Sequence, residues 1–71
     1  MRRVETIDYR NAIYCGYVEV ENSPLSMIFQ GSGILLYDDN TCLIASWNGN
    51  EPIRSSMIMI HPNRYITYYH S

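Results

Sequence analysis

The feature that most restricts the fold is a short pattern that occurs twice, 23 residues apart. Residues 33–40 and 56–63 each run through one small residue, four apolar residues, two turn-forming residues and Asn. Four apolar residues are too few for an amphipathic helix of several turns, and Asp, Pro and Asn favour tight reversals of the chain. Each copy therefore predicts a strand that enters a hairpin turn, with the returning strands expected at 41–47 and 65–69.

Composition supports a fold made of strands alone. Val, Ile, Thr and the aromatic residues make up 24 of 71 residues, while Ala and Gln are scarce and Lys is absent. The former types favour strands, and the latter support helices. Upstream, residues 13–21 predict a further strand that stops at a turn cluster, Asn22-Ser23-Pro24, and residues 25–29 fit a weak strand or an inserted loop. We expect an all-β chain.

Size and charge limit the class of protein. A chain of 71 residues forms one small β domain, 1–71, in which 11–47 is the most repeat-like part and 53–70 is a degenerate last hairpin. The apolar runs are far shorter than the roughly 20 residues that a membrane span needs, and the first eight residues are too polar for a signal peptide. We therefore expect an intracellular, cytoplasmic protein. A net charge of −2, with five Arg, argues against a general nucleic-acid surface.

One segment resembles a known repeat family. The pattern Tyr14-x-Gly16-x-Val18, followed by Gly31-x-Gly33-x-x-x-Tyr37-x-x-Asn40-x-x-Leu43-x-Ala45-x-Trp47, is similar to the MORN repeat, in which Tyr-x-Gly-x-aromatic is followed by Gly-x-Gly-x-x-x-Tyr-x-x-Gly. Asn40, Leu43 and Ala45 stand where the family has Gly, Tyr and Gly. The third unit keeps only Ser56, Asn63, Tyr65 and Tyr69.

The resemblance covers about two and a half units, from Asn11 to about Tyr69. It implies an antiparallel meander of stacked β-hairpins in which these glycines, aromatic residues and turn residues are structural. It also implies a scaffold for other proteins, with binding of membrane lipid in some members. Repeat units of this kind bury their faces only against their neighbours.

Alternation along the strands predicts two faces, and both are apolar. One face would carry Leu35, Tyr37, Leu43, Ala45, Trp47, Ile58 and Ile60, and the other Ile34, Leu36, Cys42, Ile44, Met57 and Met59. The second face has to be covered by the amino-terminal segment, by closure into a small β-barrel, or by another chain. We favour another chain. The expected docking residues are Ile34, Leu36, Ile44, Met57, Met59, Tyr17 and Tyr68.

The candidates for metal binding or catalysis are few. Cys15, Cys42, His61 and His70 are separated by 27, 19 and 9 residues, whereas structural zinc sites pair ligands two to four residues apart. A Cys42–His61 nucleophile pair would need an orienting group and an oxyanion site, and the sequence offers neither. We expect two reduced thiols, no metal or cofactor site and no catalytic residues.

The sequence therefore predicts a non-catalytic scaffold or accessory subunit. It would dock an apolar, aromatic sheet face onto a larger protein complex or onto further copies of itself. The alternative is a small β-barrel that binds a peptide or single-stranded nucleic acid through its tyrosines, although only Arg10, Arg54 and Arg64 would supply positive charge within the folded region.

Overall fold

The computed structural model describes residues 2–22 and 25–69. Ser23 and Pro24, from the predicted turn cluster, and His70, from the candidate metal ligands, lie outside these residues. The elements are, in chain order, β1 (Arg2–Tyr9), β2 (Ala12–Asn22), β3 (Leu25–Tyr37), β4 (Cys42–Asn48), β5 (Glu51–Pro52), the 3-10 helix η1 (Arg54–Ser56), β6 (Ile58–Ile60) and β7 (Ile66–Tyr68).

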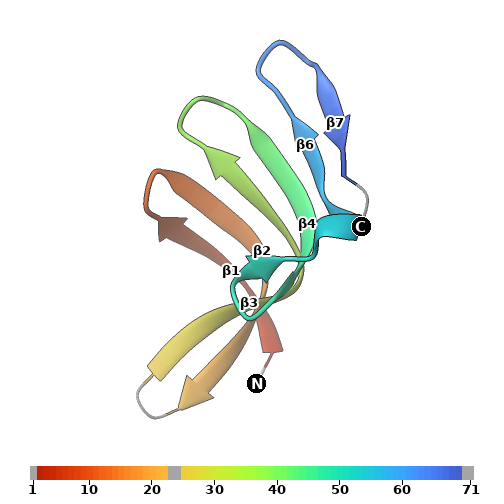
Figure 1. The fold of residues 1–71 in the computed structure, drawn as a ribbon. Helices are drawn as coiled ribbons and strands as arrows, with labels where there is room; N and C mark the ends of the chain where they lie inside the picture. The colour runs from red at the N-terminus through yellow and green to blue at the C-terminus, as the bar shows by residue number, and fades with distance from the viewer. Residues whose placement is uncertain (1, 23–24, 70–71) are drawn as a thin grey trace.

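The strands form one antiparallel sheet in the order β1-β2-β3-β4-β6-β7, with β5 paired to β4. Three hairpins, β1/β2, β3/β4 and β6/β7, lie side by side with their turns at the same end of the molecule (Figure 1). The predicted all-β meander is confirmed. The barrel alternative is wrong, because no pairing within 2–22 and 25–69 joins β1 to β7.

The turns of the second and third hairpins have the same hydrogen bonds. Tyr37 N donates to Thr41 O in one turn, and His61 N donates to Tyr65 O in the other, both at 2.8 Å. The two turns are therefore equivalent at a spacing of 24 residues. The predicted spacing of 23 is wrong for the folded chain, and with it the assignment of Asn63 to the position of Asn40.

The shift of one residue changes the faces of β6. Leu35, Leu43 and Met59 lie directly opposite one another across the sheet, and so do Ile34, Ile44 and Ile58. Because successive side chains point to opposite faces, a one-residue slip moves every side chain of a strand to the other face. The predicted positions of Met57 and Met59 on the docking face, and of Ile58 and Ile60 on the core face, are wrong. Both methionines pack against the core cluster.

The link between β4 and β6 fixes this register. Ser56, at the end of η1, accepts a hydrogen bond from Ser46 N at 2.9 Å and donates one to Ile53 O at 2.6 Å. Ile53 N donates in turn to Ser46 O at 2.8 Å. These contacts hold the start of β6 against β4, so the length of the link decides which residues of β6 face inward.

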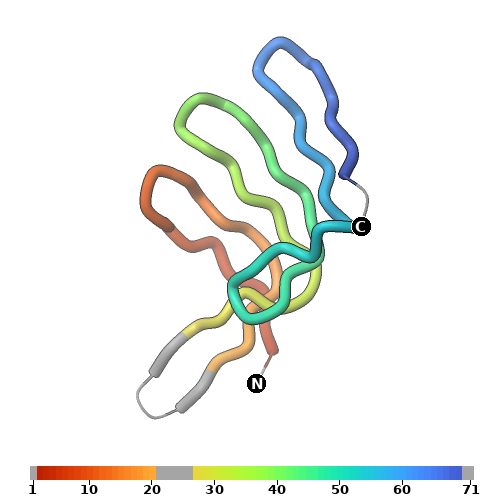
Figure 2. Tube along the Cα trace, viewed as in Figure 1, coloured from red at the N-terminus to blue at the C-terminus, as the bar shows by residue number. Residues whose placement is uncertain are grey.

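Strand β3 is continuous from Leu25 to Tyr37, so the short apolar segment at 25–29 is neither weak nor a loop. The pairing of β2 with β3 shifts between Gly16 and Val18, and Gly31 has a φ of 100° within this irregularity. An irregularity of this kind bends a strand, and its glycine adopts a conformation that other residues avoid. The far ends of β2 and β3 consequently run away from the three hairpin turns (Figure 2).

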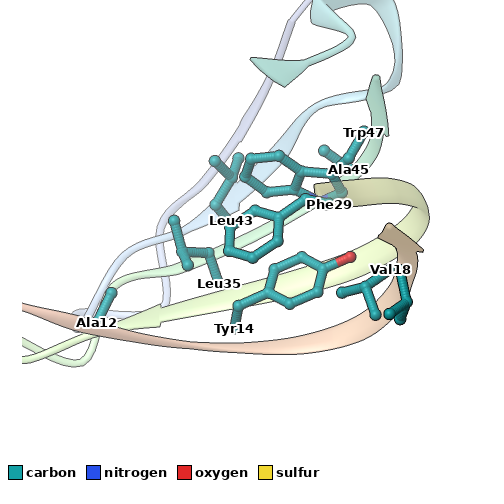
Figure 3. Packing of buried hydrophobic residues seen from close by; sticks show 9 residues of the cluster. Ala12, Tyr14, Val18, Phe29, Leu35, Leu43, Ala45 and Trp47 are labelled. Atoms are coloured by element: carbon teal, nitrogen blue, oxygen red, sulfur yellow. The ribbon is translucent and has the colours of Figure 1, made fainter. Parts of the chain in front are cut away.

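The bend brings Phe29 over the inner face of the sheet (Figure 3). Its ring stacks on Tyr14 with the centroids 3.7 Å apart, and Trp47 meets both rings edge-on. The core cluster consists of Ala12, Tyr14, Val18, Val20, Phe29, Leu35, Leu43, Ala45 and Trp47. The predicted structural roles of Tyr14, Leu43 and Trp47 are confirmed.

Two glycines make room for the Tyr14 ring. Gly16 and Gly33 lie opposite one another on β2 and β3, and a Cβ on Gly33 would overlap the phenol of Tyr14. The Tyr14 hydroxyl donates to Tyr17 O at 2.6 Å, and Trp47 Nε1 donates to Gly33 O at 3.2 Å. The Tyr-x-Gly and Gly-x-Gly patterns therefore have a steric cause in this chain, as their predicted structural role requires.

Candidate interaction surface

The face of the sheet opposite the core carries two rows of directly opposed side chains, one from each of β2, β3, β4, β6 and β7. The first row is Ile13, Leu36, Cys42, Ile60 and Ile66, and the second is Cys15, Ile34, Ile44, Ile58 and Tyr68. We call these ten residues the outer face. The two thiols are weakly polar at most, so the outer face is apolar over its whole width.

The outer face is accessible in the monomer. Ile13, Ile34, Leu36, Ile66 and Tyr68 expose between 42% and 62% of their surface. A lone antiparallel sheet normally turns polar side chains to water on the face away from its core. Single exposed apolar residues are common, but a contiguous apolar surface of this kind marks an interaction site.

The apolar rows end on one side only. On β1 the first row meets Asp8 and the second meets Thr6, so polar side chains close the outer face at that edge. On the other side the rows end at Ile66 and Tyr68, which belong to the edge strand β7. The apolar surface therefore extends from β2 to a free edge of the sheet.

The structure places four of the seven predicted docking residues in the rows: Ile34, Leu36, Ile44 and Tyr68. Tyr17 lies on the same side of the sheet, opposite Val4 of β1, beyond the ends of the rows. Met57 and Met59 face the core. The prediction missed Ile13 and Ile66, which the alternation along their strands signals, and Ile58 and Ile60, which the 24-residue spacing would have identified.

The predicted structural residues of the last hairpin differ in their burial. Tyr69 is half-buried, donates to Met59 Sδ at 3.9 Å, and lies under the Arg54 guanidinium at 5.5 Å. Tyr65 is 68% exposed and only touches the His61 ring, at a centroid distance of 5.9 Å, so its predicted packing role is wrong. Asn63 accepts a hydrogen bond from Tyr65 N at 3.0 Å, as Asp39 does from Thr41 N at 2.9 Å.

The titratable groups of the sheet have structural partners. His61 Nε2 bonds to Thr67 Oγ1 at 2.9 Å on the core side, whereas Cys42 points to the outer face. The two side chains of the proposed nucleophile pair therefore lie on opposite sides of the sheet. Cys15 and Cys42 are free thiols, and Cys15 Sγ accepts a weak hydrogen bond from Thr6 Oγ1 at 3.7 Å.

Within the described part of the chain, no three of His, Cys, Asp and Glu lie close enough together to hold a metal ion, and no pocket opens in the surface. Hydrogen bonds from the side chain and the backbone N–H of Thr41 lower the pKa of Asp39, and the charge of His61 adds to this effect. These contacts order the hairpin turn. The outer face is thus the main chemical feature of the surface.

Comparison with known protein families, with curated proteins and with solved structures gave no match. Among residues 2–22 and 25–69, no helix has the length and apolar character to cross a membrane.

Proposed function

We propose that this protein is a non-catalytic scaffold or accessory subunit that docks its outer face onto an apolar surface of a larger protein assembly. The observation that carries the proposal is the pair of apolar rows, which cross five strands without a charged residue. The resemblance of residues 31–47 to the MORN repeat supports the same role, because such repeats scaffold other proteins.

The free energy available from docking is large for a chain of this size. Burying a large aliphatic side chain completely contributes roughly 1.5 to 3 kcal/mol. Ile13, Ile34, Leu36 and Ile66 each retain a little less than half of their surface in water. Covering six side chains of this kind would contribute roughly 4 to 8 kcal/mol before the cost of association, which is comparable to the net stability of a small domain.

A substitution on the outer face tests the proposal. Ile34→Glu places a charge in the middle of the second row without touching the core, so the variant should melt like the wild type but lose its partner proteins. Asn11→Glu adds the same charge at an exposed turn beside the rows and serves as the control. Trp47→Ala, which removes a buried core ring, should instead unfold the domain at a cost of roughly 3 to 5 kcal/mol.

The measurement is quantitative mass spectrometry of proteins that co-purify with each tagged variant from the native cell, together with thermal melting of the purified chains. Proteins retained by Asn11→Glu and lost by Ile34→Glu support docking through the outer face. If Ile34→Glu keeps every partner of the wild type, the assignment of this face is wrong. Flotation of the wild type with anionic vesicles, abolished by Ile34→Glu, would replace the protein partner with a lipid surface.

A further inference from the structure

The β7 edge has the same geometry as the edge at which the sheet already adds a hairpin. Tyr65 and Tyr69 form main-chain hydrogen bonds toward β6, through His61 N to Tyr65 O and Tyr69 N to Met57 O. Because antiparallel strands alternate the direction of these groups, the N–H and C=O groups of Ile66 and Tyr68 point away from β6. No other described strand pairs with this side of β7.

Ile66 and Tyr68 are the equivalents, 24 residues on, of Cys42 and Ile44 in β4. In β4 those two residues pair with Ile60 and Ile58 of the next hairpin. The sheet therefore shows, within one molecule, that this edge accepts an antiparallel strand. The β7 edge repeats the arrangement with its partner position open.

The two edges of the sheet differ in charge. β1 carries Arg2, Arg3, Glu5 and Asp8, with an ion pair between Arg3 and Glu5 at 2.6 Å. β7 reads Ile-Thr-Tyr and has no charged residue. Natural sheets protect their edges with charged side chains, which make pairing with another strand costly. β1 has this protection and β7 lacks it.

We propose that β7 pairs in antiparallel orientation with β7 of a second copy, about a two-fold axis that passes through Thr67. In this register Ile66 of one copy lies opposite Tyr68 of the other, and both outward-pointing residues of each strand are engaged. The two pairs form four main-chain hydrogen bonds, and Thr67 faces its own equivalent between them. Other centres of symmetry engage fewer outward-pointing groups of the strand, so this register satisfies the edge best.

The side chains agree with this register. It places a β-branched residue opposite an aromatic residue on the outer face, and Thr opposite Thr on the core side, which are favourable cross-strand pairs. Each apolar row then continues into a row of the second copy. The contrasting arrangement, β7 against β1 of another copy, would place Ile66 opposite Asp8 and would repeat without closing.

Cross-linking tests the register directly. In a Cys15→Ser/Cys42→Ser background, Thr67→Cys should form a disulfide-linked dimer under mild oxidation, because opposed residues of a pair without mutual hydrogen bonds lie about 4.5 Å apart at Cα. Tyr65→Cys, on the same side of the sheet and exposed, serves as the control and should remain largely monomeric. Equal cross-linking of both variants, or of neither, would overturn the register.

Sedimentation velocity over a concentration series tests the pairing without a cross-link. The interface is short, so we expect a dimer that dissociates on dilution. A chain synthesised with an N-methyl group on the Tyr68 amide should weaken the dimer at least tenfold. Ile34→Glu should leave it unchanged, which separates this edge from docking through the outer face. A wild-type monomer at every concentration, an unaffected N-methyl chain, or species that grow beyond the dimer would each contradict the proposal.

Discussion

Asn40 and Arg64 adopt the same left-handed conformation, with φ of 70° and 69°, at equivalent positions of two successive hairpin turns. In a three-residue hairpin loop this is the position that follows a type I turn, and glycine occupies it at least cost. Asn tolerates the conformation well, whereas Arg has no such advantage. The last turn therefore carries more backbone strain than the one before it.

Replacing Arg64 by Gly should consequently stabilise the protein. We expect a gain of about 0.5 to 1 kcal/mol in the free energy of unfolding, with a smaller effect for Asn40→Gly, because the removed strain exceeds the added freedom of the unfolded chain. Urea denaturation followed by tyrosine and tryptophan fluorescence measures both. Asn63→Gly is the informative contrast: it should destabilise, since the Asn63 side chain accepts a hydrogen bond. Stabilisation by Asn63→Gly alone would restore the 23-residue equivalence.

The close approach of Tyr14 to Gly33 predicts a steric effect. Gly33→Ala should cost about 1 to 3 kcal/mol, because the added methyl overlaps a ring that the stack with Phe29 holds in place. Gly49→Asn is the control, since a Cβ there meets nothing within 4 Å and Asn accepts the φ of 62°. Chemical denaturation of both variants checks the prediction, and equal losses would show that conformational freedom rather than space decides.

Asn50 should be important for holding the bend of β3. Its Oδ1 accepts from Phe29 N at 2.7 Å, and its own N–H donates to Phe29 O at 3.1 Å. Asn50→Gly keeps the left-handed backbone but removes the acceptor, so we expect a loss of about 1 to 2 kcal/mol. Asn50→Asp retains an acceptor and should lose less. Hydrogen exchange at the Phe29 amide provides the measurement, and unchanged protection in Asn50→Gly would show that the side chain holds nothing.

Alkaline pH should destabilise the core through Tyr14. Burial of the phenol raises its pKa, and the charge of Cys15 raises it further. A raised pKa in the folded state means that this contribution to stability is complete below the unfolded value of about 10 and is lost as the pH rises through the folded value. The wild type should therefore lose more stability than Tyr14→Phe between about pH 8 and about pH 11.

At neutral pH the order reverses, because Tyr14→Phe lacks the hydrogen bond to Tyr17 O and should be less stable by about 1 kcal/mol. Denaturant titrations of both proteins at several pH values measure the two effects together. Tyr17→Phe, at an exposed position, is the control for general tyrosine ionisation. Parallel pH profiles for all three proteins would exclude Tyr14 as the source.

The parts of the fold that could be predicted are those governed by local chemistry. Asp38-Asp39-Asn40 is a turn by composition, and the structure has a hairpin there with Thr41 N bonded to Asp39. The spacing of Tyr14, Gly16 and Gly33 likewise reflects a steric requirement that short patterns record. Both faces of the sheet are apolar as the alternation predicts.

The features that escaped prediction depend on contacts distant in sequence. The faces of Met59 and Ile58 follow from the length of the link through η1, which the bonds of Ser56 determine. The role of Phe29 depends on the bend at Gly31, and nothing near Phe29 in the chain indicates that Asn50 will bind its backbone. A pattern that repeats imperfectly leaves such one-residue choices open.

The order of the strands also bears on how the chain acquires its structure. Nearly every pairing joins a strand to the one before it, and only β5 and η1 intervene between β4 and β6. Short loops close at little entropic cost, so refolding should be fast for an all-β protein. During synthesis on the ribosome, each hairpin can form on the edge of the preceding one as soon as it emerges, which leaves β7 as the last strand to be added.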